Sequence, residues 1–204
     1  QSVSGKSRRL MKRWAKKKVA TIERAGLCGF VFKSRSPSSG MRGVKVYSQE
    51  GQISTTGAGL FAKAFMRRFP WLPVEDEERL HDPALRENFI ERVFVYKRWQ
   101  AYVEGDGSIK GLVAFHSNHK YVIMAHSQQC YKTLGSMVAA AGKAHREKLV
   151  SGYIGTLMEG LSFLATVKKN TNVLQHIAGY FNNSLSREEK RELTDVIMSY
   201  YDRL

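Results

Sequence analysis

Apolar residues in the first 80 positions alternate between helical spacing and short continuous runs. The helical spacing is clearest before Gly26, where Leu10, Trp14, Val19 and Ile22 fall roughly on one helical face. Two short runs follow that are typical of strands. The pattern predicts helices over 8–26 and 57–70 and strands over 28–32 and 44–48. This order of elements predicts an α/β unit, which we interpret as an incomplete Rossmann-like domain.

The sequence after residue 80 has helical periodicity and no strand period. Asp82 followed by proline is a typical helix start, and the glycines of "GDGS" break that helix. Near the end, "SREE" matches a capping box. The predicted helices cover 82–103 and 109–126, with two more within 127–167, one beginning at 170 and one at 186. We therefore expect an all-α C-terminal domain.

Charge also differs between the two halves. Residues 1–45 hold thirteen Lys or Arg against one acid, whereas residues 46–204 hold twenty against seventeen. The acidic segment "PVEDEERLHDP" at 73–83 has proline at both ends, which is typical of a linker. We place the boundary near residue 80, which predicts domains of 1–80 and 81–204.

The net charge of +15 and the pI near 9.9 indicate a polyanionic partner, either nucleic acid or an anionic membrane. No apolar run reaches the 18 residues that would predict a membrane span, so we expect no membrane and favour nucleic acid. Cys28 and Cys130 form neither a disulfide framework nor a metal-ligand pair, and they fit a reducing compartment. Because no apolar stretch follows the basic N-terminal residues, we expect a cytoplasmic protein.

The segment "KSRSPSSG" at 33–40 follows the first predicted strand and combines cations with hydroxyls. Sites in open α/β sheets form beyond the carboxyl ends of strands, so we expect this loop to bind an anion or a nucleotide. Its spacing differs from a Walker loop, and a solvated turn is the alternative. The candidates are Lys33, Arg35, Ser36, Ser38 and Ser39, with Gly40 allowing close approach of the backbone.

Two clusters in the C-terminal half combine cations with aromatic or amide side chains, as RNA-binding surfaces do. The histidines of "HSNHK" leave two alternatives open, a structural polar cluster and a metal site, although no third ligand at matching spacing is visible. With two lysines of the first helix, the candidate RNA-binding residues are Lys12, Lys16, Arg98, Trp99, His116, His119, Lys120, Lys168, Lys169, Asn172 and His176.

Longer strings resemble a known family. "GLCGFVFKSRSPSSGMRGVKVYS" resembles the end of TudS-type thiouracil desulfidase domains, and "HDPALRENFIERVFVYKRWQ", "GLVAFHSNHKYVIMAHS" and "NTNVLQHIAGYF" are similar to the YbgA-like helical domain often fused behind it. The order resembles RudS-type desulfidases, which convert 4-thiouridine in tRNA to uridine. The resemblance implies tRNA as partner, gripped by the helical domain. It also implies an oxygen-sensitive [4Fe-4S] cluster whose open iron takes sulfur from the thiocarbonyl.

The resemblance also implies roles for the loop residues. Ser36, the first serine of "SPSSG", matches the catalytic hydroxyl, and Lys33 and Arg35 would orient phosphate or stabilise developing charge. The family's segment with cluster cysteines and an acidic catalytic residue is expected outside this chain. Ser39 stands where the family usually has a cysteine ligand. Cys28 is a candidate replacement, but it lies at the other end of the strand, roughly 17 Å from Lys33.

We therefore predict an iron–sulfur-dependent tRNA 4-thiouridine desulfidase that is active only together with that segment. The alternative is an RNA-binding protein that retains the fold without a cluster, which Ser39 suggests. A helical DNA-binding regulator is a third hypothesis, although no convincing helix-turn-helix spacing is present.

Overall fold

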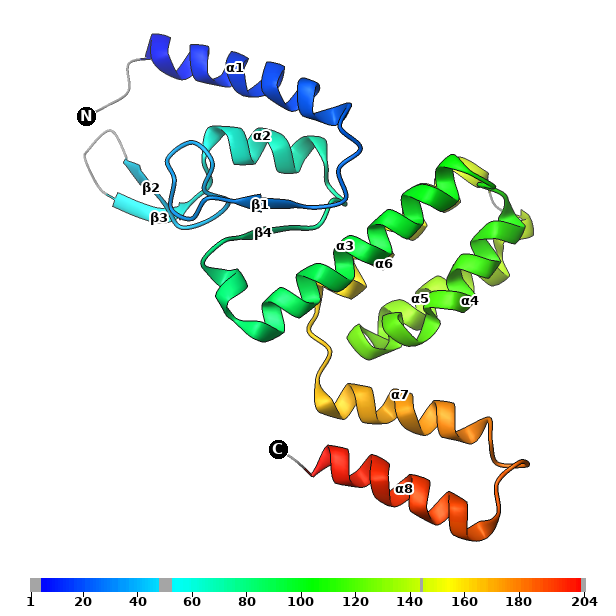
Figure 1. The fold of residues 1–204 in the computed structure, drawn as a ribbon. Helices are drawn as coiled ribbons and strands as arrows, with labels where there is room; N and C mark the ends of the chain where they lie inside the picture. Colours follow the sequence, from blue (N-terminus) through cyan, green and yellow to red (C-terminus); the bar gives the residue numbers. More distant parts are fainter. Residues whose placement is uncertain (1–4, 48–52, 144, 203–204) are drawn as a thin grey trace. The chain divides into compact units, whose positions relative to one another are not determined.

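The computed structural model describes residues 5–47, 53–143 and 145–202 (Figure 1). The chain divides into two compact units, Gln1–Lys97 and Arg98–Leu204. The first unit contains helices α1 (Gly5–Glu23), α2 (Leu60–Arg68), the short helix η1 (Arg79–His81) and most of α3 (Pro83–Glu104), with strands β1 (Phe30–Phe32), β2 (Val44–Tyr47), β3 (Ile53–Gly57) and β4 (Val74–Asp76). The predicted helices and strands of this half are therefore confirmed, apart from their exact ends.

Aromatic side chains fill the core of the N-terminal unit. Phe32 of β1 meets Phe65 of α2 edge to face, with ring centroids 5.5 Å apart, and both rings are buried. Ala15 and Val19 bring α1 onto the same cluster. In Figure 1, α2 lies between α1 and β1. This packing fixes the point at which the chain leaves β1 and enters the loop that carries Ser36.

The apolar face predicted for α1 is only half correct. Val19 is buried and Ile22 packs against the core, but Leu10 and Trp14 are 57% and 52% exposed. Ala15 is buried instead, because its small side chain fits where the helix approaches the aromatic core. The buried side chains of α1 therefore lie in its second half, while Lys12, Lys16, Lys17 and Lys18 of the same helix are exposed.

Two strands that the pattern did not predict, β3 and β4, complete two small sheets. β4 pairs with β1 in parallel, with Phe30 opposite Val74 and Phe32 opposite Asp76. β2 and β3 pair antiparallel, with a register shift after Val44. The Rossmann-like architecture is therefore not confirmed, because the parallel sheet among the described residues has only two strands. A full doubly wound sheet would show several parallel strands joined by helices.

The interpretation of 73–83 as a linker is wrong. The Phe30 amide donates to the Pro73 carbonyl at 2.9 Å, so strand pairing begins at the proline. The segment then continues through β4 and η1 into α3. Asp82 caps α3 as predicted, since its carboxylate accepts from the amides of Ala84 and Leu85. An acidic buried strand escapes the hydrophobic pattern because carboxylates usually lie in solvent.

The C-terminal unit consists of helices joined by turns, with no strand among its described residues, as predicted. The Ser108 and Ser127 side chains cap α4 and α5, and the predicted capping box of Ser186 and Glu189 opens α8. Its elements are the end of α3, α4 (Ile109–His126), α5 (Gln128–Ala139), the short helix η2 (Ala141–Lys143), α6 (Arg146–Ser162), α7 (Val167–Gly179) and α8 (Arg187–Tyr201).

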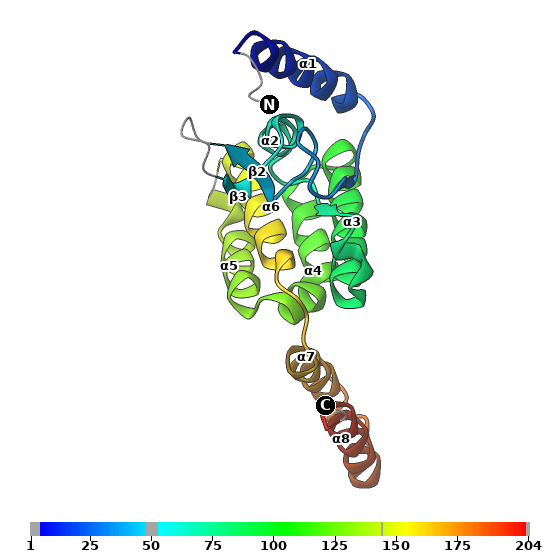
Figure 2. The same cartoon turned by 90° about the vertical axis from the view of Figure 1, so that its left-hand side faces the viewer.

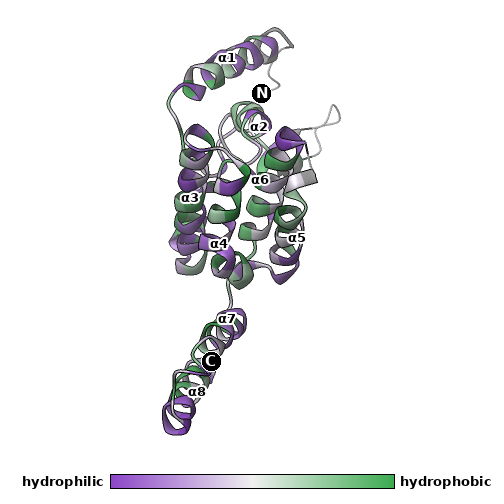
Figure 3. Ribbon diagram, turned by 90° about the vertical axis from the view of Figure 1, so that its right-hand side faces the viewer, coloured by the Kyte–Doolittle hydropathy of each residue, from purple (hydrophilic) through white to green (hydrophobic). Residues whose placement is uncertain are grey.

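Helices α4, α5 and α6 pack against one another, and α7 joins them through α4, with α8 packed on α7 (Figure 2). Tyr153 of α6 is fully buried and stacks on Trp99 at 5.3 Å. Gly160 allows α6 to approach α5, because a Cβ there would stand 2.8 Å from the Cβ of Cys130. The hydropathy colouring of Figure 3 is consistent with this burial, with hydrophobic turns along α6 and hydrophilic turns along α1.

No single described helix is long and apolar enough to cross a membrane; α6 and α7 meet that test only as a pair bent by 120°.

Candidate functional site

The loop over residues 33–43, which we call the serine loop, is fastened at its start to the acidic end of β4. Ser34 donates its hydroxyl to Asp76 Oδ1 at 3.0 Å and accepts from the Glu78 amide at 3.3 Å. Arg35 donates to Glu78 Oε2 at 2.9 Å. The φ of Arg35 is +52°, a backbone conformation that residues other than glycine rarely adopt. These contacts on both sides hold the loop in this tight bend.

The far end of the serine loop is held by two buried carboxylates. Glu75 and Asp76 are 5% and 6% exposed. Arg42 of the loop donates to Glu75 Oε1 at 3.1 Å, and its Nε lies 3.8 Å from Asp76 Oδ2. Arg79 donates to the same Glu75 oxygen at 3.0 Å, and its amide donates to Asp76 Oδ1. Buried carboxylates are stable only when paired and hydrogen-bonded, and here two arginines and the backbone meet that need.

A third arginine lies at the start of β4. Arg92 of α3 donates to the Val74 carbonyl at 3.2 Å and to Asn88 Oδ1 at 3.4 Å. Its burial lowers the pKa of the guanidinium, and Glu75 partly offsets that effect. The acidic run "VEDEER" was the only signal in the sequence for this network of carboxylates and arginines. Sequence reasoning missed its members, which are Arg42, Glu75, Asp76, Arg79 and Arg92.

The hydroxyls of the serine loop lie together. Ser36 Oγ and Ser38 Oγ are 3.4 Å apart, and the Ser39 amide donates to Ser36 Oγ at 3.3 Å. The Ser38 carbonyl accepts from the Phe61 and Ala62 amides at 2.9 and 3.3 Å, so the loop caps α2. The structure thus brings the three predicted serines into one turn, half-buried against the start of a helix.

Two glycines permit this close contact between loop and helix. A Cβ at Gly59 would stand 2.2 Å from the Ser38 carbonyl oxygen, and one at Gly40 would stand 2.7 Å from the Ser36 carbonyl oxygen. The close backbone approach expected at Gly40 is therefore present. It brings Gly40 against the backbone of Ser36 within the same loop.

The two predicted phosphate-binding cations of the loop are paired with acids. Lys33 Nζ lies 2.5 Å from Glu77 Oε1, and this hydrogen bond raises the pKa of Lys33. Arg35 is paired with Glu78. Both cationic side chains are at least 70% exposed, so solvent screens these pairs. Their contact with a nucleotide stays a prediction, and phosphate would have to compete with Glu77 and Glu78.

The described residues do not fit an iron–sulfur cluster by themselves. Among residues 5–47, 53–143 and 145–202, no three His, Cys, Asp or Glu side chains are grouped to hold a metal ion. The Cys28 thiol lies 3.7 Å from the Gly26 carbonyl in the turn before β1, and Cys130 is buried in the other unit. Ser39 offers a hydroxyl where a soft thiolate would be needed. The expected [4Fe-4S] cluster stays a prediction that requires other ligands.

A groove of about 700 Å³ between α1 and α2, which we call the basic groove, gathers cations in the N-terminal unit. Lys12 and Lys16 of α1 lie there as exposed side chains, and their contact with RNA stays a prediction; the cations that join them from α2 were not predicted. Arg68 at its edge also binds Glu23, with Nε 3.1 Å from Oε2. The groove is lined by Lys12, Lys16, Val19, Ala20, Leu60, Lys63, Ala64, Arg67 and Arg68, and none of these is acidic.

The C-terminal unit buries two residues expected to face RNA. Trp99 is 5% exposed and stacks on Tyr153. His119 is 6% exposed, with Nδ1 2.7 Å from the Phe115 carbonyl and its ring stacked on Phe115. Direct contact of Trp99 and His119 with RNA is incompatible with this burial, because both rings belong to the core. Arg98 is exposed.

His116 is half-buried, and its Nδ1 lies 3.0 Å from the Tyr153 hydroxyl. Burial is the main cause that lowers the pKa of both His116 and His119. The two histidines therefore form the structural polar cluster that the spacing left open.

Lys120 lies on the surface among aromatic rings. Its Nζ donates to the Tyr180 hydroxyl at 3.2 Å and stands 4.8 Å from the centroid of the Tyr121 ring. Hydrogen bonds from Tyr121 and Lys120 lower the pKa of Tyr180, which is 68% exposed. The neighbouring Phe181 is 48% exposed. This combination of cation and exposed rings suits RNA, and sequence reasoning missed Tyr180 and Phe181.

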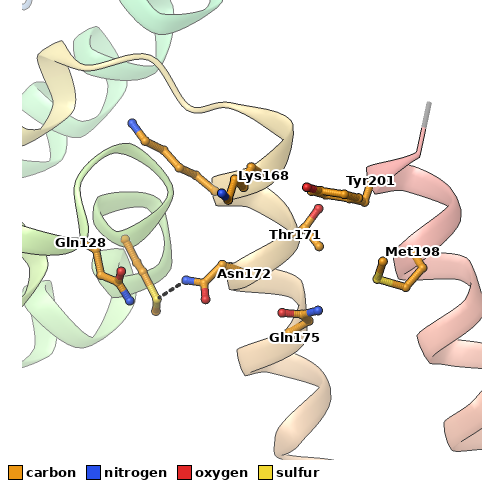
Figure 4. A pocket seen from close by; sticks show the side chains of 9 residues that line it. Gln128, Lys168, Thr171, Asn172, Gln175, Met198 and Tyr201 are labelled. Carbon is orange, nitrogen blue, oxygen red and sulfur yellow. Dashed lines mark hydrogen bonds between the residues drawn. The ribbon is translucent and has the colours of Figure 1, made fainter. Parts of the chain in front are cut away.

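The last predicted cluster lies on α7 (Figure 4). Lys168, Asn172 and His176 recur at helical spacing, and Lys168 and His176 are exposed. Lys169 is different, because its Nζ donates to the carbonyls of His126 and Leu164 at 2.7 and 2.9 Å. Lys169 thus fastens the connection between α6 and α7 to the end of α4.

Two protein families match separate parts of the chain, one in each compact unit. Residues 4–77 match the family described as 2-thiouracil desulfurase, which indicates a role in sulfur removal. Residues 120–204 match a family described as a protein of unknown function, DUF1722. The chain is similar to the uncharacterized protein YbgA of Escherichia coli K12, with 34% identity over 115 residues, 56% of this chain and 68% of that protein. No solved structure matches significantly.

Proposed function

This chain belongs to the YbgA family, and we propose that it acts in the removal of sulfur from 4-thiouridine in tRNA. The observation that carries the proposal is the serine loop, which lies inside the desulfurase match and presents clustered hydroxyls beside the end of a strand. Polyanionic RNA as the substrate is supported by the basic groove and by the exposed Lys120 surface.

The reaction replaces the thiocarbonyl sulfur of the base by oxygen from water, so that uridine forms and sulfur leaves as sulfide. Sulfur stays at the same oxidation level, and one water supplies the oxygen and two protons. We assign Ser36 to this step because its hydroxyl is half-buried and has only long contacts within the loop, 3.4 Å to Ser38 Oγ and 3.3 Å to the Ser39 amide. A hydroxyl there can donate to the departing sulfur and relay a proton to it. Asp76 and Ser34 position the loop and take no part in the bond changes.

A second candidate function is RNA binding without catalysis. It is favoured by Ser39, which replaces the cysteine of the family motif, and by the pairing of Lys33 and Arg35 with acids. In that case the serine loop would be only a scaffold.

Single-turnover desulfurisation by the intact, anaerobically prepared protein separates the two. We expect Ser36→Ala to slow the conversion of 4-thiouridine in tRNA by about two to four orders of magnitude, as loss of a proton-transferring group does, with little change in tRNA affinity. Ser136→Ala on α5 is the matched control. If wild-type protein binds tRNA and never converts it, the binding function holds. If Ser36→Ala reacts at the wild-type rate, the assignment of Ser36 is wrong.

A further inference from the structure

A trough of about 620 Å³ lies over the exposed face of α7, between the α4–α5 junction and α8 (Figure 4). We call it the α7 trough. Its volume falls within the range of about 300 to 1,000 Å³ that is typical of small-ligand sites. All its lining residues belong to the C-terminal unit. The trough has no role in the proposed chemistry of the serine loop.

The lining of the α7 trough has the chemistry of a nucleotide site. Gln128, Asn172 and Gln175 bring three amides to it, and such groups can read the hydrogen-bonding edge of a base. Within the described residues, no hydrogen bond uses the side-chain amides of Gln128 or Gln175. Tyr201 of α8 offers an aromatic ring that is 38% exposed, on which a base can stack.

The positive charge of the α7 trough favours an anionic ligand. Lys168 is exposed and forms no ion pair with any described residue, and no acidic side chain lines the α7 trough. A phosphate bound to Lys168 would stand beside the amide cluster. This arrangement of a cation, three amides and a ring fits one nucleotide.

A second hollow continues the α7 trough along the helix. It measures about 200 Å³, shares Met124 with the trough, and includes His176, Lys120 and Tyr180. Lys120 of α4 and Tyr180, directly after α7, thus repeat the combination of a cation and a ring. Such repetition is typical of surfaces that bind successive nucleotides of a single strand.

We infer that the α7 trough binds one unpaired nucleotide of an RNA, with its base between Tyr201 and the amides and its phosphate on Lys168. The choice of RNA over a free nucleotide rests on the proposed function, and it is supported by the second hollow. A paired base would not enter, since its reading edge is already hydrogen-bonded within the duplex.

The test compares binding of an RNA hairpin with an unpaired loop and of a blunt RNA duplex of the same length. We expect the wild-type chain to prefer the hairpin. Gln128→Leu/Gln175→Leu should lose about tenfold in hairpin affinity and leave duplex affinity unchanged. Neither glutamine is buried, so the fold should persist, which thermal melting checks. Gln129→Leu, an exposed neighbour outside the trough, is the control.

Lys168→Ala should lower the salt dependence of hairpin binding by about one counterion, whereas the exposed Lys148→Ala should not. If the double variant keeps the preference for the hairpin, the inference is wrong. If uridine monophosphate binds and the hairpin does not, RNA is the wrong source of the nucleotide.

Failure of this inference is distinguishable from failure of the proposed function. Trough variants that bind tRNA normally while desulfurisation proceeds would overturn only the trough. Wild-type protein that prefers the hairpin but never converts 4-thiouridine would overturn only the desulfurisation.

Discussion

At the scale of single residues, the position of Ser36 depends on side chains that have no chemical role of their own. Asp76 receives the hydroxyl of Ser34 and the amide of Arg79, and Glu75 receives two guanidinium groups. These contacts join both ends of the serine loop to β4. The conformation of the serine loop therefore depends on the hydrogen bonds and ion pairs of Glu75 and Asp76.

Asp76→Ala should destabilise the N-terminal unit by about 2 to 4 kcal/mol, because it leaves the part-buried Ser34 hydroxyl and Arg79 amide without their acceptor and removes one of the two carboxylates that face Arg42. Denaturant unfolding measures the effect. Glu78→Gln, which changes only a solvent-exposed pair with Arg35, is the control and should cost much less. An Asp76→Ala variant as stable as the control would show that the network does not hold the loop.

Stability should also fall in mild acid because of the buried histidines. In the unfolded chain an imidazole takes up a proton near pH 6.5, but burial lowers the pKa of His119 in the folded state. The folded state therefore loses stability as the pH falls from about 6.5 through that lowered pKa. We expect the melting temperature to drop between pH 7 and pH 5.

The fall in melting temperature between pH 7 and pH 5 should be smaller in His119→Leu, because leucine cannot take up a proton on unfolding. Asn118→Ala, an exposed change on the same helix, should keep the wild-type pH profile. An unchanged profile in His119→Leu would contradict the prediction.

Residue types alone could not separate surface from core in this chain. Trp99 and His119 belong to strings of cations and aromatics that are typical of RNA-binding surfaces, and yet both are buried. Helical spacing identifies residues on a common face, but it does not tell which face meets other helices. Ser36, Ser38 and Ser39 could be grouped from the sequence because neighbours in one turn need no tertiary information, and their role in binding or catalysis stays a prediction.

At the scale of elements, the helices were predictable and β4 was not. Helix starts such as Asp82 and Ser186 depend on local hydrogen bonds, so the sequence near them is sufficient. The burial of β4 depends on Arg42, 33 positions before Glu75, and on Arg79. A contact between segments so far apart leaves no periodic signal in the strand itself.

Under the proposed function, the basic groove predicts that cations of α1 and α2 contribute together to tRNA binding. Lys12→Ala/Lys63→Ala should reduce the slope of log affinity against log salt by about two, because each of the two lysines neutralises about one phosphate. Fluorescence anisotropy over a salt series measures this slope. Lys17→Ala, exposed on α1 but outside the groove, should leave it unchanged. A flat salt dependence of the wild type would reject electrostatic binding altogether.

At the scale of the whole molecule, cysteine placement limits cofactor chemistry. The chain has two cysteines, and they lie in different compact units. Thiolates are thus too few for a stable four-iron cluster on residues 1–204. Anaerobic reconstitution of this chain, followed by iron and sulfide analysis, should give well under one cluster per chain. A stable stoichiometric cluster would show that oxygen or nitrogen ligands replace the missing thiolates.

The docking of α8 has a consequence for the timescale of motion. Among its described side chains only Ile197 is buried, and the Asn170–Tyr200 hydrogen bond helps to join α8 to α7. Amide hydrogens of α8 should therefore exchange with deuterium sooner than those of α6, whose apolar side chains are buried in larger number. Because Met198 and Tyr201 form one wall of the α7 trough, we expect the nucleotide inferred to bind there to stay only while α8 is docked. Saturating RNA should therefore slow deuterium uptake in α8.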